Sequence, residues 1–411
     1  MPLLANENGE TLGRLRAQVA YAHERSPAFR SRVDATFGAR GSWAVADFAS
    51  MVPAVSKESL IAAQESDPPF GGMLCVDSRE LGRIYHTAGS LYIGFTDGDI
   101  ARAEGNLARE WARLGVGKSD VADITSTYHG AYAGTILDGS FRQAGATVIP
   151  GGPGNSDLRL KVMRDLGVTV LQAFTTYAET LAAQRLERES DRRTSLRLLI
   201  IGGELRTTDA KRRLSEAWDG AVVIENYGTA EVGVVALGCE VGAGMHLLDD
   251  AVIEIVDPET GQTRDPEAGG EIVATELWRR GQPFVRFRTG DITEGVDFRP
   301  CPCGRLSPRL GRILGRNSDL LRVRGVFVRP KIIFDALKDA GFAAPAQIVV
   351  DRPVTEDRLT IRLEGDASLT EARPAIASLV RATIGLSAAI EIVDCGALNG
   401  KPETADLRDL R

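Results

Sequence analysis

The sequence has few of the features that mark several common protein classes. Five cysteines in 411 residues are too few to brace the chain with disulfides. There is no run of about 18 apolar residues, which argues against a membrane-spanning helix. The net charge of −7 argues against nucleic acid or an acidic membrane surface as a general partner. The first residues lack a cationic lead followed by an apolar block, so we expect no secretory signal and a cytoplasmic protein.

The composition is that of a globular chain, with 43% hydrophobic and 26% charged residues. Residues 10–33 are predicted to form one helix, because apolar residues recur there at spacings of three or four. From about residue 100, short apolar runs such as VADITST, VTVLQAF and LRLLIIGGE alternate with helical patterns, which predicts βαβ units and a largely parallel sheet. Between 245 and 300 the alternation of strands and turn residues predicts antiparallel strands.

The last part of the chain has a helix–strand–strand–helix–strand pattern of its own, preceded by a small hairpin. Its length is within the usual range of a domain. We therefore predict an α/β protein with two domains. Residues 1–316 would form a large body of mixed sheets with a β-rich subdomain, and residues 317–411 a small α+β domain.

Polar residues follow the predicted strand AVVI, in the segment ENYGTAEVG. The ends of strands in α/β proteins are common ligand sites. Thr229 could hydrogen-bond a phosphate, and Glu231 could hold Mg²⁺. An ordinary turn with a solvated glutamate explains these residues equally well.

Two later segments suit a nucleotide. In PFVRFRTGDI, Asp291 could accept both hydroxyls of a ribose, and Arg288 could face a phosphate or brace that carboxylate. In GRILGRNSD, Arg316 could reach an anion from the junction between domains. The alternatives are a hairpin turn with an Asx bond and a basic solvated linker.

The cysteines and one histidine form a second pattern. Cys239 and His246 are seven residues apart in GCEVGAGMH, and Cys301 and Cys303 follow later in CPCGR. Three thiolates and one imidazole are the ligands of a closed structural zinc site. The alternative is two unrelated pairs of residues.

Taken in order, YGTAE, RFRTGD and GRNSD before a small last domain resemble the adenylate-forming superfamily, and within it the phenylacetate–CoA ligase family. The segments RSPAFRSRV, VSKESLIAAQESDPPFGGM, RIYHTAGS and AYAGTILDGSFRQAGATVIPGG resemble that family as well, so the resemblance covers essentially the whole chain. It implies two steps. A carboxylate attacks the α-phosphate of ATP to form an acyl-adenylate and pyrophosphate. After the small domain rotates, a thiol of coenzyme A or of a carrier protein displaces AMP.

The resemblance also implies roles for single residues. Asp291 would bind the ribose, Arg316 would lie near the nucleotide phosphate, and Lys401 would neutralise charge on the α-phosphate in the first transition state. The remaining implied contacts, to adenine, phosphates and Mg²⁺, are Thr87, Ser90, Gly202, Gly203, Glu204, Tyr227, Gly228, Thr229 and Glu231.

The chain departs from the family where the triphosphate would bind. HTAGSLYIGFT, from His86 to Thr96, is shorter than the family's phosphate loop and has lost its Thr-Thr-Gly, its proline and its lysine. Ser318 stands where an acidic hinge residue is usual, and GGELR replaces Ala-Glu-Pro-Trp. Besides an ATP-dependent ligase, two alternatives stay open: an ATP-independent acyl transferase and a non-catalytic binding relative.

The acid site is expected in loops that combine aromatic side chains with small ones, such as STYHGAYAG, which favours a flat aromatic acid. The expected cofactors are structural zinc, ATP or AMP with Mg²⁺, and coenzyme A. The resemblance also makes a homodimer an option. The candidate contacts to the acid are Tyr128, His129, Tyr132, Gly152 and Tyr177.

Overall fold

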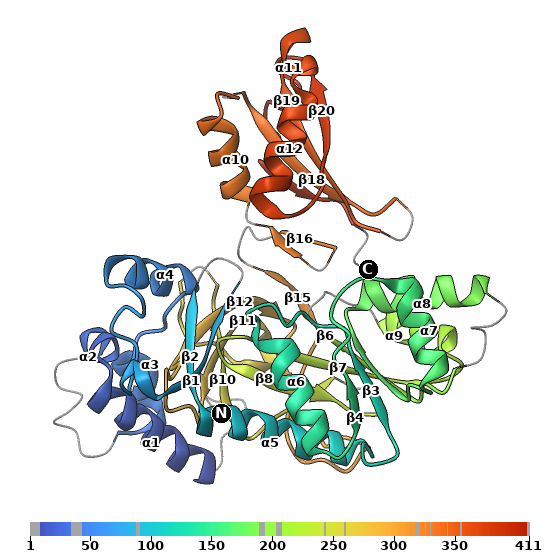
Figure 1. Cartoon of the computed structure of the whole chain (residues 1–411). Helices are drawn as coiled ribbons and strands as arrows, with labels where there is room; N and C mark the ends of the chain where they lie inside the picture. The colour runs from blue at the N-terminus through green and yellow to red at the C-terminus, as the bar shows by residue number, and fades with distance from the viewer. Residues whose placement is uncertain are drawn as a thin grey trace. The chain divides into compact units, whose positions relative to one another are not determined.

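The computed structural model describes residues 9–33, 43–87, 91–188, 194–202, 208–241, 244–258, 260–316, 321–324, 326–328, 330–342, 344–353 and 356–408. The chain divides into two compact units, Met1–Asn317 and Ser318–Arg411 (Figure 1). Both units mix helices with β-sheets, so the α/β class predicted from the sequence is confirmed. No helix among the described residues is long and apolar enough to cross a membrane.

A nine-stranded sheet organises the first unit, in the order β13-β14-β9-β8-β7-β6-β5-β3-β4. The neighbours from β7 to β4 are parallel, as the apolar runs predict, and those from β7 to β13 are antiparallel. The strands are β3 (Val121–Ile124), β4 (Thr147–Ile149), β5 (Val170–Ala173), β6 (Leu198–Gly202), β7 (Val222–Thr229), β8 (Gly233–Gly238), β9 (Met245–Leu247), β13 (Val296–Asp297) and β14 (Arg309–Leu310).

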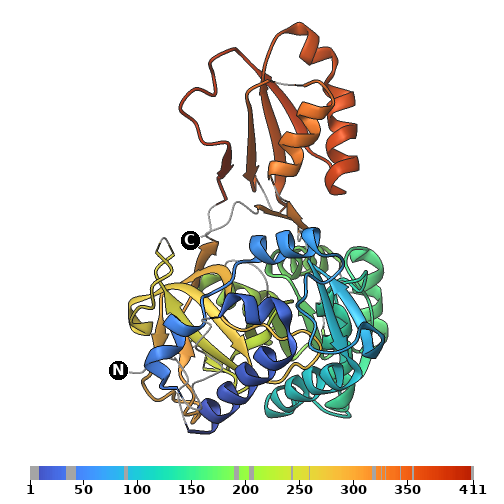
Figure 2. The same ribbon diagram turned by 90° about the vertical axis from the view of Figure 1, so that its left-hand side faces the viewer.

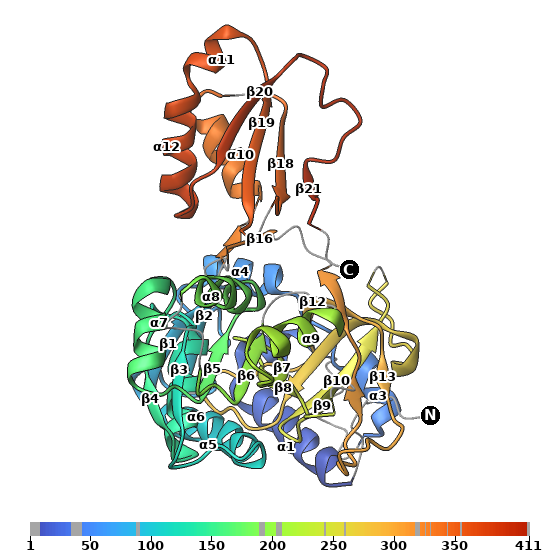
Figure 3. The same cartoon turned by 90° about the vertical axis from the view of Figure 1, so that its right-hand side faces the viewer.

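Helices cover both faces of the parallel strands (Figures 1 and 3). Side chains alternate along a strand, so Ile200 of β6 packs into the core that includes α5 and α6, while Leu199 and Ile201 pack into the core of α7, α8 and α9. Because helices cover both faces of the sheet, a ligand can approach the parallel strands only at their ends. The helices are α5 (Asp97–Arg113), α6 (Tyr132–Gln143), α7 (Ser156–Asp165), α8 (Thr175–Glu187) and α9 (Thr208–Ala217).

The rest of the first unit is an antiparallel sheet and an N-terminal group of helices. The sheet consists of β10 (Ala251–Val256), β11 (Gly270–Glu276), β12 (Phe287–Thr293) and β15 (Ile313–Arg316). A hairpin of β1 (Leu81–His86) and β2 (Tyr92–Thr96) forms a separate two-stranded sheet. The helices are α1 (Gly9–Arg25), α2 (Pro27–Arg32), α3 (Val45–Met51) and α4 (Lys57–Ser66).

The single helix predicted over residues 10–33 is wrong, because the chain breaks at Ser26. The Ser26 hydroxyl accepts a bond from the amide of Phe29 and caps α2, which begins at Pro27. Proline has no amide hydrogen for the preceding helix and suits the first position of the next one.

The second unit has a four-stranded sheet with the order β20-β19-β18-β21. Helices α10 and α12 lie on one side of it, and the segment between β20 and β21 runs on the other (Figures 2 and 3). The predicted element order is present, whereas β21 and the short α11 were not predicted. The elements are β16 (Leu321–Val323), β17 (Val326–Val328), α10 (Pro330–Asp339), β18 (Ala346–Asp351), β19 (Arg358–Glu364), α11 (Ala367–Glu371), α12 (Arg373–Ile384), β20 (Ala389–Val393) and β21 (Thr404–Asp406).

Candidate functional site

Asp291 joins the two sheets of the first unit. It lies on β12 opposite Arg316 of β15, and the Nε of Arg316 donates to its Oδ1 at 2.9 Å. The hydroxyl of Tyr227, on β7, donates to its Oδ2 at 3.0 Å. Burial raises the pKa of Asp291, and Arg316 and Tyr227 oppose that shift by stabilising the carboxylate. Both oxygens of the carboxylate are therefore held in place.

Tyr227 and Gly228 close β7 against the next strand. Burial raises the pKa of Tyr227 well above its ordinary value, so its hydroxyl stays a donor at neutral pH. A Cβ on Gly228 would lie 2.3 Å from the carbonyl oxygen of Gly233, which no side chain can do. The YGTAE segment therefore keeps a glycine because two backbones meet there.

Glu231 is a buried carboxylate with a lysine partner that the sequence analysis missed. The Nζ of Lys57 lies 3.0 Å from its Oε1. Burial raises the pKa of Glu231, but Lys57 and the hydroxyl of Thr229 more than offset this, and its pKa is lowered. Lys57 opens α4, whose N-cap is Ser56, and the preceding Val55 bonds to the backbone of β12. The absence of a lysine in the shortened loop is the signal that could have prompted a search for another cation.

The segment expected to bind the triphosphate is partly described. The amide of Thr87 donates to the carbonyl of Leu91 at 3.0 Å. The Thr87 hydroxyl is buried and has no partner within the described part of the chain. The amide of His86 donates to the carbonyl of Gly130, which ties the end of β1 to the STYHGAYAG loop. Ser90 lies outside the described residues.

The adenine-side segment is described only at its start. Gly202 ends β6, and a Cβ there would lie 2.4 Å from the Oδ1 of Asn226 on β7. Gly203 and Glu204 lie outside the described residues, as does Ser318 at the junction of the two units.

The three aromatic candidates near residue 130 have different surroundings. Tyr132 is buried, stacks on Phe95 at 5.3 Å between ring centroids and meets Tyr85 edge-on. Tyr128 donates to the carboxylate of Asp138 at 3.3 Å. His129 is exposed. Of these, Tyr132 belongs to an aromatic cluster beside the β7–β8 turn, because its hydroxyl oxygen would lie 3.1 Å from a Cβ on Gly233.

Tyr177 and Gly152 are tied together by a buried arginine. Arg159 forms an ion pair with Asp123, donates to the carbonyl of Gly152, and donates to the hydroxyl of Tyr177 at 3.2 Å. The Tyr177 hydroxyl in turn donates to the carbonyl of Gly154 at 3.0 Å. These groups hold the glycine-rich loop to α7 and α8.

Arg288 does not brace Asp291. Its guanidinium donates to both oxygens of Glu271 on β11 and to the carbonyl of Pro258. Arg316 makes the contact with Asp291 instead. The alternation of side chains explains the difference, because residues 288 and 291 lie on opposite faces of β12.

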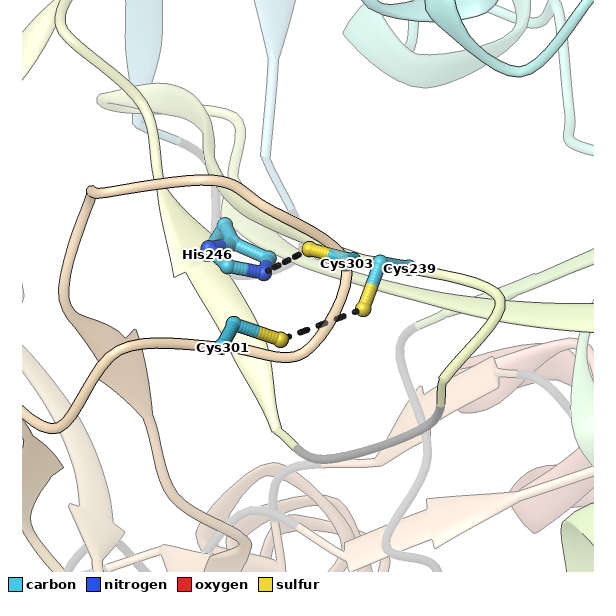
Figure 4. Close-up of side chains that lie close together, drawn as sticks. All are labelled: Cys239, His246, Cys301 and Cys303. Carbon is cyan, nitrogen blue, oxygen red and sulfur yellow. Dashed lines mark hydrogen bonds between the residues drawn. The ribbon is translucent and has the colours of Figure 1, made fainter.

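The four metal-ligand candidates meet at one place (Figure 4). The ligand atoms of Cys239, His246, Cys301 and Cys303 all lie within 4.8 Å of one another. The Nδ1 of His246 is 3.1 Å from the carbonyl of Ser307, which leaves Nε2 directed to Cys303 at 3.2 Å. Burial lowers the pKa of His246, which favours the neutral ring that binds metal. The donor set and its spacing fit a tetrahedral zinc ion.

Lys401 belongs to the second unit, and its side chain is exposed. Its amide donates to the carbonyl of Leu398 at 3.0 Å, which closes a turn just before β21. The Glu364 carboxylate and Gln347 bond to the backbone of the same segment.

The chain is similar in sequence to known AMP-binding enzymes. The model of the family of AMP-binding enzymes matches residues 103–277. A phenylacetate–coenzyme A ligase of Thermus thermophilus is 30% identical over 362 residues, which are 85% of this chain and 80% of that protein. The ligase of the same name from Escherichia coli is 27% identical over 94% of this chain and 90% of its own.

Solved structures agree with these relatives. A 2-hydroxyisobutyryl-CoA ligase, in complex with 2-HIB-AMP and CoA, is similar with a TM-score of 0.87 and 25% identity, over 98% of this chain and 90% of its own. The expected alternatives, an ATP-independent acyl transferase and a non-catalytic binding protein, find no support among these relatives.

Proposed function

The chain belongs to the phenylacetate–coenzyme A ligase family of AMP-binding enzymes and is an acid–thiol ligase acting through an acyl-adenylate, and on this premise we propose that its acid is an aromatic carboxylate and its acceptor coenzyme A. The observation that carries the nucleotide part of the proposal is the Asp291 carboxylate, held by Tyr227 and Arg316 beside the end of the parallel strand β7. Ligands of α/β sheets bind at such strand ends.

Asp291 binds the ribose of the nucleotide in this proposal. Each carboxylate oxygen has two lone pairs, and each already accepts one bond from Tyr227 or Arg316. One acceptor site per oxygen is left, which suits the two hydroxyls of a ribose. Gly203 and Glu204, which follow Gly202 in the sequence, contribute to the adenine side.

The first step joins the acid to AMP. An oxygen of the substrate carboxylate attacks the α-phosphorus of ATP, and the bond to pyrophosphate breaks. The hydroxyls of Thr87, Ser90 and Thr229 donate to phosphate oxygens, and Arg316 supplies charge nearby. The Thr87 hydroxyl, buried without a partner in the described part of the chain, supports this role.

Glu231 would hold the Mg²⁺ that accompanies ATP. Its carboxylate is of the type that Mg²⁺ prefers, and the ammonium of Lys57, now 3.0 Å from Oε1, would have to move aside for the ion. Lys57, at the start of α4 and beside Glu231, would supply the cation that the shortened loop lacks. A bound Mg²⁺ would neutralise charge on the phosphates.

Lys401 neutralises charge on the α-phosphate and the acid during the first step. Its exposed ammonium is accessible to a ligand. In the second step the thiol of coenzyme A attacks the acyl carbon, and AMP leaves with the bonding electrons.

An aromatic acid suits the cluster of rings that includes Tyr132, Phe95 and Tyr85. Flat rings offer stacking and edge contacts to a flat substrate. Tyr128 and His129 lie on the loop that leads to Tyr132, and Gly152 and Tyr177 shape the neighbouring loop through Arg159.

Zinc is structural in this proposal. The site of Cys239, His246, Cys301 and Cys303 uses four protein ligands and leaves no position for a substrate. It ties the β8–β9 connection to the segment between β13 and β14.

The proposal is tested by following pyrophosphate release and CoA thioester formation with ATP, Mg²⁺ and a panel of acids. The panel pairs phenylacetate, benzoate and hydroxylated benzoates with aliphatic acids such as 2-hydroxyisobutyrate. We expect release only with an acid present, and faster turnover for the aromatic acids. Faster turnover of the aliphatic acids would overturn the aromatic substrate, and the absence of any acid-dependent release would overturn adenylation from ATP.

A further inference from the structure

We propose that Glu364 and Gln347 are positioning residues for Lys401, because they grip the segment that carries it from both sides. The inference rests on the role proposed for Lys401 in the first step. Neither residue is within the motifs from which the function was inferred.

Glu364 holds the segment before Lys401. It ends β19, its side chain is buried, and its Oε2 accepts from the amide of Gly396 at 2.9 Å. Its Oε1 accepts from the amide of Leu398 at 2.6 Å. Hydrogen bonds to a carboxylate are about twice as strong as neutral ones. Because the amide of Lys401 bonds to the carbonyl of Leu398, fixing Leu398 also fixes the turn that carries Lys401.

Gln347 holds the segment after Lys401. It is buried on β18, and its Nε2 donates to the carbonyl of Pro402 at 2.9 Å. The amide of Ile348 donates to the carbonyl of Glu403 at 2.8 Å and continues the attachment into β21. Lys401 thus lies between two anchored residues, Leu398 and Pro402.

Both anchors lie on the face of the sheet opposite the hydrophobic core. Their strand neighbours Ile348 and Leu363 belong to that core, and side chains alternate along a strand. Figures 2 and 3 show α10 and α12 on one side and the segment between β20 and β21 on the other. A buried Glu and Gln on this face need partners, and the backbone beside Lys401 supplies them.

The position of an ammonium decides how much it lowers a barrier, since a misplacement of about 1 Å can cost on the order of 100-fold in rate. Lys401 has a long flexible side chain, so the backbone that carries it must supply the precision. The thiol step does not use Lys401 in our proposal. Loosening the segment should therefore slow adenylation and spare thioester formation.

The test begins with Glu364→Gln, which keeps the size of the side chain. The change turns one acceptor oxygen into an NH₂ group that faces a backbone N–H, so one of the two bonds to the segment is lost. We expect Glu364→Gln to lower phenylacetate-dependent pyrophosphate release by about tenfold or more. CoA thioester formation from synthetic phenylacetyl-adenylate should stay within about twofold of wild type.

Gln347→Ala should act in the same direction, and it serves if Glu364→Gln fails to fold. The matched control is Asp351→Asn on β18, whose carboxylate accepts from Arg358 of β19 at 2.9 Å and not from the Lys401 segment. We expect the control to leave both steps unchanged. Wild-type pyrophosphate release in Glu364→Gln, while Lys401→Ala abolishes it, would overturn the inference.

A failure of the role of Lys401 can be distinguished from a failure of the proposed ligase activity. If Lys401→Ala releases pyrophosphate at the wild-type rate, the role of Lys401 fails, and the inference fails with it. If the wild-type protein activates no acid, the proposed function fails, and amide hydrogen exchange decides the positioning. Faster exchange over residues 396–401 in Glu364→Gln but not in Asp351→Asn would support it, and unchanged exchange would overturn it.

Discussion

The ammonium of Lys57 lies 3.0 Å from Oε1 of Glu231, which places a cation from the start of α4 against a buried carboxylate in the turn after β7. Lys57 is the main group that lowers the pKa of Glu231 against the effect of burial. The pair therefore links the N-terminal helices to the candidate site, and its strength can be measured.

Lys57→Met should destabilise the fold by about 1–3 kcal/mol at pH 7, because it leaves a buried carboxylate without its cation. In the wild type the pKa of Glu231 is lowered, so its ionised form stabilises the fold at any pH above the ordinary glutamate pKa of about 4.3. This stabilisation is lost as the pH falls below that value. In Lys57→Met, burial dominates and raises the pKa of Glu231. The contribution of Glu231 to the free energy of unfolding therefore falls as the pH rises toward 7.

Urea unfolding between pH 4 and pH 7 measures both effects. The control is Lys161→Met, which removes an exposed pair with Asp165 on α7 and should change stability by less than about 0.5 kcal/mol. Equal stability of Lys57→Met and wild type at pH 7 would contradict the prediction.

Tyr227→Phe removes the hydroxyl that holds Oδ2 of Asp291, while it keeps the buried ring. Hydrogen bonds to charged groups contribute about 1.5–3 kcal/mol, so we expect the dissociation constant of AMP to rise about tenfold. Isothermal titration measures it. Tyr21→Phe is the control, because the Tyr21 hydroxyl bonds only to the carbonyl of Arg280 among the described residues. Equal AMP affinity in Tyr227→Phe and wild type would remove Asp291 from the nucleotide site.

Purified protein should contain one zinc ion per chain, measured by elemental analysis. Cys303→Ser should lose the ion and unfold at a lower temperature, because a structural metal contributes directly to folding. Cys395→Ser should keep it, since Cys395 is exposed and lies outside the cluster. A metal-free wild type, or full zinc content in Cys303→Ser, would contradict the assignment.

Gly228→Ala should destabilise the protein by about 3 kcal/mol or more, because the new Cβ would lie 2.3 Å from the carbonyl oxygen of Gly233, and two paired strands cannot separate there cheaply. Gly105→Ala is the contrast within the same unit. Gly105 is inside α5, its Cβ would lie 3.4 Å from the end of Gln143, and alanine should stabilise the helix by up to about 1 kcal/mol. Thermal unfolding should show a lower unfolding temperature for Gly228→Ala and a higher one for Gly105→Ala.

Parts of the fold and of the site could be predicted where the information is local. The apolar runs that became β5 and β6 are buried on both faces, and such runs are typical of parallel strands. The four residues of the Cys/His cluster could be singled out because thiols and imidazoles are few in this sequence and have specific chemistry. The break at Ser26 was missed, although serine before proline is a start signal for a helix.

The sequence by itself determined the α/β class, the family, and the types of polar residue available at the strand ends. The tertiary structure decided which of them meet. Arg316 rather than Arg288 reaches Asp291, Lys57 from a distant helix pairs with Glu231, and Tyr177 is engaged by Arg159. The physical reason is that hydrogen bonds and ion pairs act over a few ångströms, and only the packing of the sheets brings residues far apart in the chain within that distance.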